Sequence, residues 1–220
     1  MASAFVKTSA DAHNFSQSLR SWEIMAKPFL SVIVPAYPAT EQLPLTLIDI
    51  DRHLSQQEYS YEIVLVNGGA VQKFSELIKN LKLVESTNED GYGALARQGM
   101  FIAKGNWRLL MDPRNIVSVE EFGNMLPYFS EDYEVLTGNE NFLCFSETAA
   151  MQIFPLTKTS RWAFGYETLK IAQKLKYKIK KIRVAINDGV RPKFGFISFV
   201  NRLWEIAKIN WRTRKLSKLT

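Results

Sequence analysis

The chain has 220 residues, of which 46% are hydrophobic and 12% aromatic, and its formal net charge is +6. This length and composition suffice for one sizeable core, and they exclude a disordered tail, a collagen-like chain and a small disulfide scaffold. The apolar runs are far shorter than the roughly 20 residues that a membrane-spanning helix needs, so no transmembrane span is predicted.

The first segment, Met1–Lys27, is rich in serine and alanine and has no continuous apolar stretch, so it is not a secretory signal peptide. We interpret residues 1–27 as a flexible arm. An organellar transit peptide is the alternative, because acidic residues are scarce there. The predicted domain covers residues 28–190, and residues 191–220 form a basic amphipathic helix and tail.

Two β-branched runs, Leu30–Pro35 and Tyr61–Val66, predict buried strands that end in loops. Between them, apolar residues recur at helical spacing, at Leu43, Leu47, Ile50 and Leu54. Strand, helix and strand in this order form a βαβ unit, which predicts an α/β fold with a mainly parallel sheet.

The alternation continues along the chain. The periodicity predicts helices over residues 74–81, 93–103, 119–126 and 165–175, and strands over residues 83–85, 106–111, 134–136, 141–145 and 179–184. In open α/β sheets the ligand binds beyond the carboxyl ends of the strands. The loops that matter are therefore Pro35–Glu41, Asn67–Val71, Glu89–Gly93 and Asp112–Asn115. Neither a dinucleotide fingerprint nor a P-loop is present.

These loops, in this order, resemble those of family 2 glycosyltransferases of the GT-A fold, and especially the dolichyl- or polyprenyl-phosphate sugar synthases. The segments in register are Ser31–Tyr37, Asn67–Gly69, Gly91–Ala94 with Arg97, Met111–Asn115, and Ala163–Glu167. The similarity covers about Leu30 to Trp211. It implies a nucleotide-sugar donor, a polyprenyl-phosphate acceptor and a Mg²⁺ or Mn²⁺ ion.

The chain departs from the family pattern at six functional positions. Tyr37–Ala39 stands where the family has Tyr-Asn-Glu, Asn67–Gly69 where it has an acidic turn, and Asp112–Arg114 where it has DxD. Gly138–Glu140 stands in place of Gly-Ser-Arg, Phe164–Glu167 in place of Phe-Asp-x-Glu, and Asp188–Gly189 in place of Ser-Lys. One aspartate beside an arginine is expected to hold a divalent ion poorly, because the two cations repel each other. Glu140 would likewise repel a phosphate acceptor.

Three residues are the candidates for chemistry. By resemblance, Asp112 is the surviving metal or diphosphate ligand, or else a cap on the turn that follows its strand. Arg114 replaces the metal as a fixed cation, or else it is a surface arginine paired with a nearby acid. Glu167 keeps a place in the catalytic site, or else it is an exposed helix residue.

The resemblance also implies a nucleotide-binding set, namely Pro35, Tyr37, Asn67, Gly68, Gly93, Arg97 and Arg114. Tyr37 either stacks on a base or fills its loop, and Arg97 is either a ligand of the nucleotide or a solvated charge. No cofactor is expected, and Mg²⁺ or Mn²⁺ would bind at Asp112 only in an active transferase.

Charge is distributed unevenly, since residues 1–157 carry 11 Lys/Arg and 19 Asp/Glu whereas residues 158–220 carry 17 and 3. The last predicted helix has an aromatic, apolar side beside a cluster of basic residues. The residues expected to contact a membrane or partner are Phe196, Phe199, Arg202, Trp204, Lys208, Trp211 and Arg212. This pattern is typical of an interfacial helix, which predicts contact with a membrane surface or a partner subunit. Packing on the protein's own sheet is the alternative, and nucleic acid is the weaker one.

The only cysteine, Cys144, can form no internal disulfide, which favours a reducing, intracellular compartment and a buried thiol. Two functions remain open for a protein at the periphery of a membrane. The first is a catalytically degenerate accessory or scaffold subunit of a larger assembly. The second is an active transferase that moves a sugar from a nucleotide donor to a polyprenyl phosphate with weak or no metal dependence.

Overall fold

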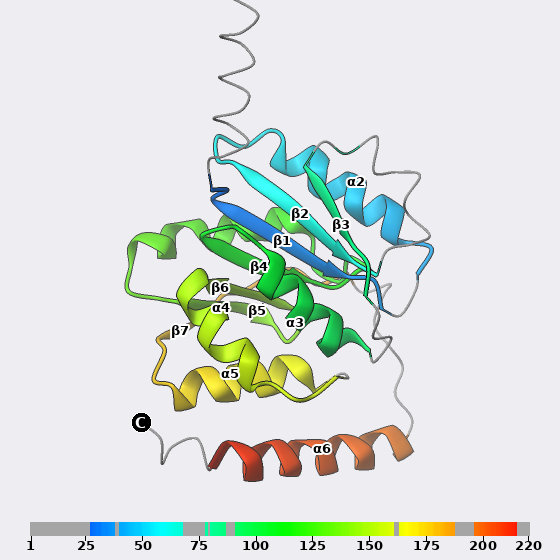
Figure 1. Cartoon of the computed structure of the whole chain (residues 1–220), viewed down its shortest axis with the longest axis vertical. Helices are drawn as coiled ribbons and strands as arrows, with labels where there is room; N and C mark the ends of the chain where they lie inside the picture. The colour runs from blue at the N-terminus through cyan, green and yellow to red at the C-terminus, as the bar shows by residue number, and fades with distance from the viewer. Residues whose placement is uncertain are drawn as a thin grey trace, which may run out of the picture.

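The computed structural model describes residues 27–37, 40–67, 78, 80–86, 91–160, 163–187 and 196–214, and for residues 196–203 it describes the backbone alone. Within these residues the chain folds around one seven-stranded sheet with the strand order β3-β2-β1-β4-β6-β5-β7 (Figure 1). The strands are β1 (Leu30–Pro35), β2 (Tyr61–Val66), β3 (Leu81–Val84), β4 (Trp107–Met111), β5 (Val135–Asn139), β6 (Phe142–Ser146) and β7 (Ile179–Lys181).

The sheet is mixed and mainly parallel, as predicted. Strands β3, β2, β1 and β4 run parallel to one another, and β7 runs parallel to β5, whereas β6 is antiparallel to both of its neighbours. Because the first four strands are parallel, their carboxyl ends meet along one edge of the sheet, which we call the carboxyl edge. The opposite edge is the amino edge.

Helices cover both faces of the sheet (Figure 1). The α-helices are α2 (Leu43–Leu54), α3 (Tyr92–Ile102), α4 (Glu147–Ile153), α5 (Phe164–Lys174) and α6 (Phe196–Arg214), and the 3₁₀ helices are η2 (Val119–Asn124), η3 (Leu126–Ser130) and η4 (Phe154–Leu156). Helix α6 is the outermost layer and lies beyond α5 at the bottom of Figure 1.

Two hydrophobic clusters form the core, one on each face of the sheet. In β1, Val32 and Val34 join the cluster under α2 and η2, whereas Ile33 joins the cluster under α3, α4 and α5. This alternation follows from the two-residue period of a strand. The four residues that predicted helix α2 are all buried against the first cluster. Cys144 is buried, and burial raises the pKa of its thiol.

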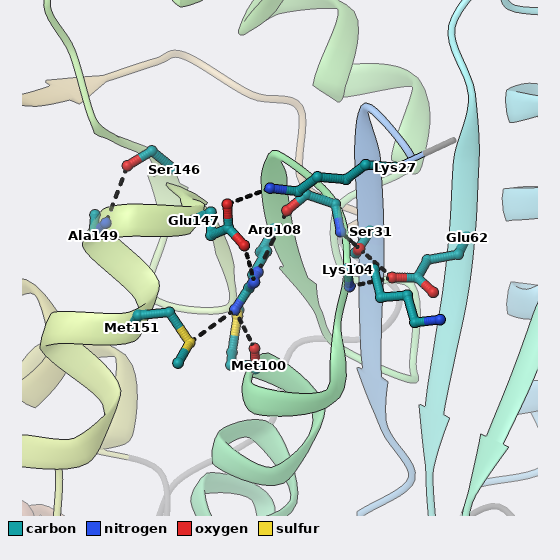
Figure 2. A network of polar contacts seen from close by, with 11 residues as sticks. Lys27, Ser31, Glu62, Met100, Lys104, Arg108, Ser146, Glu147, Ala149 and Met151 are labelled. Atoms are coloured by element: carbon teal, nitrogen blue, oxygen red, sulfur yellow. Dashed lines mark hydrogen bonds and ion pairs between the residues drawn. The ribbon is translucent and has the colours of Figure 1, made fainter. Parts of the chain in front are cut away.

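The amino edge is closed by a network of polar contacts (Figure 2). Arg108 is buried, donates to the carbonyl of Met100 at 2.6 Å, and forms an ion pair with Glu147, which also pairs with Lys27. On the neighbouring strands, Glu62 accepts from the hydroxyl of Ser31 at 2.6 Å and from the backbone of Lys104. These contacts tie residues far apart in the sequence to one edge.

Three sequence expectations differ from the structure. The helix expected over residues 119–126 is two 3₁₀ helices, η2 and η3, and Pro127 stands in the first turn of η3. Helix α4 was not predicted, because its seven residues are too few for a clear period. Leu81 begins β3 instead of ending a helix, and most of residues 74–81 lie outside the described residues.

No helix in the described part of the chain is both long and apolar enough to cross a membrane. The proposed arm lies almost wholly outside the described residues, so its extent stays a prediction. The division into residues 1–27, 28–190 and 191–220 likewise stays a prediction. An α-helix does occupy residues 196–214, but its basic amphipathic character stays a prediction over residues 196–203.

Candidate functional site at the carboxyl edge

The carboxyl edge begins at the ends of β1 and β2. Pro35 is buried at the end of β1, and Tyr37 follows with 43% of its surface exposed. Asn67 follows β2 with a left-handed backbone (φ 62°), and its backbone N–H donates to the carbonyl of Val84 at 2.8 Å. This N–H group is therefore already hydrogen-bonded to β3. Gly68 lies outside the described residues.

The next part of the edge is the glycine turn, Gly91–Gly93, which opens helix α3. Gly91 has φ 101°, a conformation that other residues rarely adopt. Segment 158–160 lies directly on this turn, since the amide of Gly93 donates to the carbonyl of Ser160 at 2.9 Å. A Cβ atom at Gly93 would stand 2.3 Å from the carbonyl oxygen of Thr159. The turn therefore admits no side chain at this position.

Asp112 follows β4 at the same edge, and its carboxylate is taken up by Arg114. The Nε and an Nη of Arg114 donate to the two carboxylate oxygens at 2.8 and 2.7 Å, and the backbone N–H of Arg114 donates to Oδ1 at 2.9 Å. Asp112 is 6% exposed, whereas the side chain of Arg114 is 28% exposed. Asp112 thus caps its turn and forms a bidentate ion pair, and Arg114 is paired with an acid.

The ion pair also affects the pKa values of nearby groups. The hydrogen bond to Asp112 raises the pKa of Arg114 above its ordinary value, although burial acts in the opposite direction. The Tyr92 hydroxyl lies in the field of both groups, and burial, with a smaller contribution from Asp112, raises its pKa well above the ordinary value. Within the described residues this hydroxyl is buried without a hydrogen-bond partner. In the sequence, only the position of Tyr92 between two glycines marks it as a site residue.

Glu167 is 1% exposed in the first turn of α5, which corrects the alternative of an exposed helix residue. Its Oε2 accepts from the backbone N–H groups of Lys158 and Thr159 at 3.0 and 2.7 Å, and its Oε1 forms an ion pair with Arg212 of α6. Glu167 thereby holds segment 158–160 and the last turn of α6 together.

Arg97 reaches the same segment from α3 and is half-buried, which corrects the alternative of a solvated charge. Its Nη1 donates to the carbonyl of Thr159 at 3.0 Å. Burial lowers the pKa of Arg97, and the nearby Glu167 partly offsets that effect. Arg97, Glu167 and Arg212 therefore meet at Thr159, a residue for which the sequence offered no signal.

Helix α6 buries one side and exposes the other. Ile209 and Thr213 are buried, whereas Trp204 and Trp211 are 64% and 63% exposed. The ammonium of Lys208, on the same side, lies 5.3 Å from the ring centre of Trp204. Of the residues predicted to contact a membrane or partner, the side chains of Phe196, Phe199 and Arg202 lie outside the described residues.

The predicted site residues form two groups at this edge. Asp112 and Arg114 contact each other, and Arg97, Glu167 and Arg212 meet around segment 158–160. Among the residues that the structure describes, no three His, Cys, Asp or Glu side chains come close enough together to hold a metal ion. Both carboxylates that were predicted to act in catalysis are paired with arginines.

The fold places the chain among proteins of the GT-A class. A mannosyltransferase from Pyrobaculum calidifontis, solved with GDP-mannose and Mn²⁺, superposes with a TM-score of 0.61 at 16% identity, covering 86% of this chain and 69% of that one. Glucosyl-3-phosphoglycerate synthase from Mycobacterium tuberculosis, solved with UDP, superposes with a TM-score of 0.63 at 10% identity, covering 84% and 80%.

The sequence comparison defines the family. The profile of glycosyl transferase family 2 matches residues 31–183, and the chain therefore belongs to this family. It is 22% identical to a dolichyl-phosphate β-glucosyltransferase of Dictyostelium discoideum, over 92% of this chain and 80% of that protein. It is also 22% identical to the human dolichyl-phosphate β-glucosyltransferase, over 74% and 68%. The predicted resemblance and fold class are confirmed.

Proposed function

We propose that the chain is a catalytically degenerate member of its family that acts as a membrane-associated accessory or scaffold subunit. One observation carries this proposal, namely the bidentate ion pair between Asp112 and Arg114. A divalent ion would have to bind a carboxylate that is already neutralised, with a guanidinium against it. The residues at the end of β4 therefore do not fit a Mg²⁺ or Mn²⁺ ion.

The state of Glu167 supports the same proposal. A general base must reach the proton that it removes, and Glu167 is covered by segment 158–160 and Arg212. Its carboxylate serves the fold in this arrangement. A scaffold needs the sheet and helices of the family, but it does not need a carboxylate at the reacting atoms.

An active transferase is the second candidate, favoured by a separate observation. The relatives named above are dolichyl-phosphate β-glucosyltransferases, and this chain spans 80% of the Dictyostelium protein. Arg114 is a fixed, partly exposed cation at the carboxyl edge. A guanidinium has five N–H donors, of which the pair with Asp112 uses two, so the remaining donors can bind a diphosphate and would then stabilise the departing nucleoside diphosphate without a metal. In this candidate Asp112→Ala and Arg114→Ala each lower turnover about tenfold or more.

Thermal unfolding with UDP, GDP and their sugars at millimolar concentration separates the two candidates. A ligand at about 100 times its dissociation constant stabilises a protein by about 2.7 kcal/mol, which raises the midpoint by several degrees. The degenerate subunit shows no shift with any nucleotide. A rise in the midpoint that needs no metal supports the active transferase. A rise that needs Mn²⁺ contradicts both roles proposed for Arg114, namely the partner that neutralises Asp112 and the cation that replaces the metal.

Membrane contact is proposed through the exposed side of α6. Tryptophan favours the headgroup region, and each Lys or Arg near an anionic surface adds about 1 kcal/mol. Flotation with vesicles of phosphatidylcholine and phosphatidylglycerol tests this contact. We expect Trp204→Ser combined with Trp211→Ser to reduce binding about tenfold. The matched control is Leu45→Ser on α2, which is 60% exposed. Equal loss in both variants, or no loss in the tryptophan variant, would contradict the proposal.

A further inference from the structure

Helix α6 is joined to the carboxyl edge through a continuous chain of polar contacts. Arg212 donates to the hydroxyl of Thr159 at 3.2 Å and pairs with Glu167. Glu167 accepts the backbone N–H groups of Lys158 and Thr159, and the carbonyl of Ser160 accepts the amide of Gly93. These few contacts connect the outermost helix with the first turn of α3.

We propose that Arg212 couples α6 to the glycine turn through its contacts with Glu167 and Thr159, which we call the latch. A ligand that moves either element then changes the stability of the other. The inference rests on the proposed function in two respects. It takes the exposed side of α6 as the membrane contact and, for the active-transferase candidate alone, the glycine turn as the nucleotide edge. The coupling itself requires neither ligand.

The burial of Glu167 makes the latch strong enough to transmit a change. With 2% of its side chain exposed, Glu167 forms a direct ion pair with Arg212, and Arg97, whose Nη1 is hydrogen-bonded to the Thr159 carbonyl, adds a second positive charge nearby. Removing one partner of a buried ion pair leaves an uncompensated charge. Segment 158–160 also loses the contact of Arg212 with the Thr159 hydroxyl and is then held less firmly on the glycine turn.

The same latch can be released. The Nε of Arg212 and an Oε of Glu205 are buried without a hydrogen-bond partner in the described part of the chain. Each such atom makes the docked position of α6 less favourable. An anionic lipid surface offers Arg212 phosphate partners that replace those it leaves. By linkage, vesicles that draw α6 away loosen the glycine turn, and in the active-transferase candidate a nucleoside diphosphate that tightens the turn holds α6 in place.

Amide hydrogen exchange on the full chain tests the coupling without either ligand. Arg212→Gln is compared with Lys208→Gln, because both remove one positive charge from α6 and only Arg212 contacts Glu167. We expect the amides of Gly93 and Thr159 to exchange about tenfold faster in Arg212→Gln and at the native rate in Lys208→Gln. Faster exchange confined to α6, or equal effects of both variants, would overturn the proposal.

The reverse experiment perturbs the other end of the chain of contacts. Gly93→Ala forces segment 158–160 to shift, since the new Cβ would meet the Thr159 carbonyl. We expect the amides of residues 209–213 in α6 to exchange severalfold faster in this variant. Gly123→Ala is the matched control, because a Cβ there has nothing within 4 Å. Unchanged exchange in α6 would contradict the coupling. Failure of nucleotide or vesicle binding would leave these exchange results as they are, so the two proposals fail separately.

Discussion

The two edges of the sheet use arginine–carboxylate pairs in different ways. At the amino edge, Arg108 and Glu147 lie 39 positions apart, and Arg108 also donates to the carbonyl of Met100 (Figure 2). At the carboxyl edge, Arg114 and Asp112 lie two positions apart in one turn. A long-range pair holds elements together, whereas a local pair can rearrange without unfolding the protein. Arg108 therefore ties distant elements together, whereas Arg114 binds Asp112 within a single turn.

The largest expected effect is at the amino edge. We expect Arg108→Met to lower the free energy of unfolding by about 3 kcal/mol, because the carbonyls of Met100 and Gly105 lose their buried donor and Glu147 loses one of its two ion-pair partners. Urea unfolding measures this loss. We expect Arg114→Met to cost about 1 kcal/mol, because Arg114 is partly exposed and the backbone N–H of residue 114 still donates to the buried Asp112 carboxylate. Equal losses would show that the two pairs do not differ in role.

Glu167 gives the next largest effect and tests whether the carboxyl edge also contains a pair that serves the fold. We expect Glu167→Ala to lower the free energy of unfolding by about 2 kcal/mol, because two backbone N–H groups and Arg212 lose their acceptor. Glu140→Ala is the control, since Glu140 is exposed, and we expect a change below about 0.5 kcal/mol. If Glu167→Ala left the free energy of unfolding unchanged, this carboxylate would be held in place for a reason other than stability.

Much of the fold could be predicted from the sequence because its strands and helices carry strong periods. Leu43, Leu47, Ile50 and Leu54 all point into the core, as their spacing indicates. The mainly parallel sheet follows from one βαβ unit and the rule that sequential strands lie near one another. Short elements escaped prediction, because a seven-residue helix such as α4 shows no more than two turns.

The site could be predicted less well, because its contacts join residues far apart in the sequence. Asp112 and Arg114 were predicted as site residues because they stand where the resembled family has its DxD motif. The ion pair between Glu167 and Arg212 spans 45 positions, and no local pattern indicates it. Thr159 likewise has no sequence signal, because its role arises from where segment 158–160 lies on the glycine turn.

The smallest expected effect concerns pH. Hydrogen bonding to Lys27 lowers the pKa of Glu147 below its ordinary value of 4.5, with a further contribution from Arg108. The folded protein therefore binds this proton less tightly than the unfolded chain does. The resulting stability is present above pH 4.5 and is lost as the pH falls through the lower folded pKa.

We expect Lys27→Met to make the loss of stability in acid shallower without abolishing it, because Arg108 remains beside Glu147. Urea unfolding at a series of pH values between neutral and mildly acidic measures the slope. Lys178→Met, which removes an exposed pair with Asp132, is the control and is expected to leave the slope near that of the native chain. A steeper dependence of stability on pH in Lys27→Met would contradict the conclusion that Lys27 lowers the pKa of Glu147.

The central claim is that Arg114 neutralises Asp112 and thereby removes the divalent metal site. Isothermal titration of Mn²⁺ in the presence of UDP, on the native chain and on Arg114→Asp, tests it most directly. Arg114→Asp replaces the competing guanidinium by a second carboxylate, which is the ligand that such an ion prefers. We predict no Mn²⁺ binding by the native chain and measurable binding by the variant. Binding of Mn²⁺ by the native chain that disappears in Arg114→Asp would contradict the account.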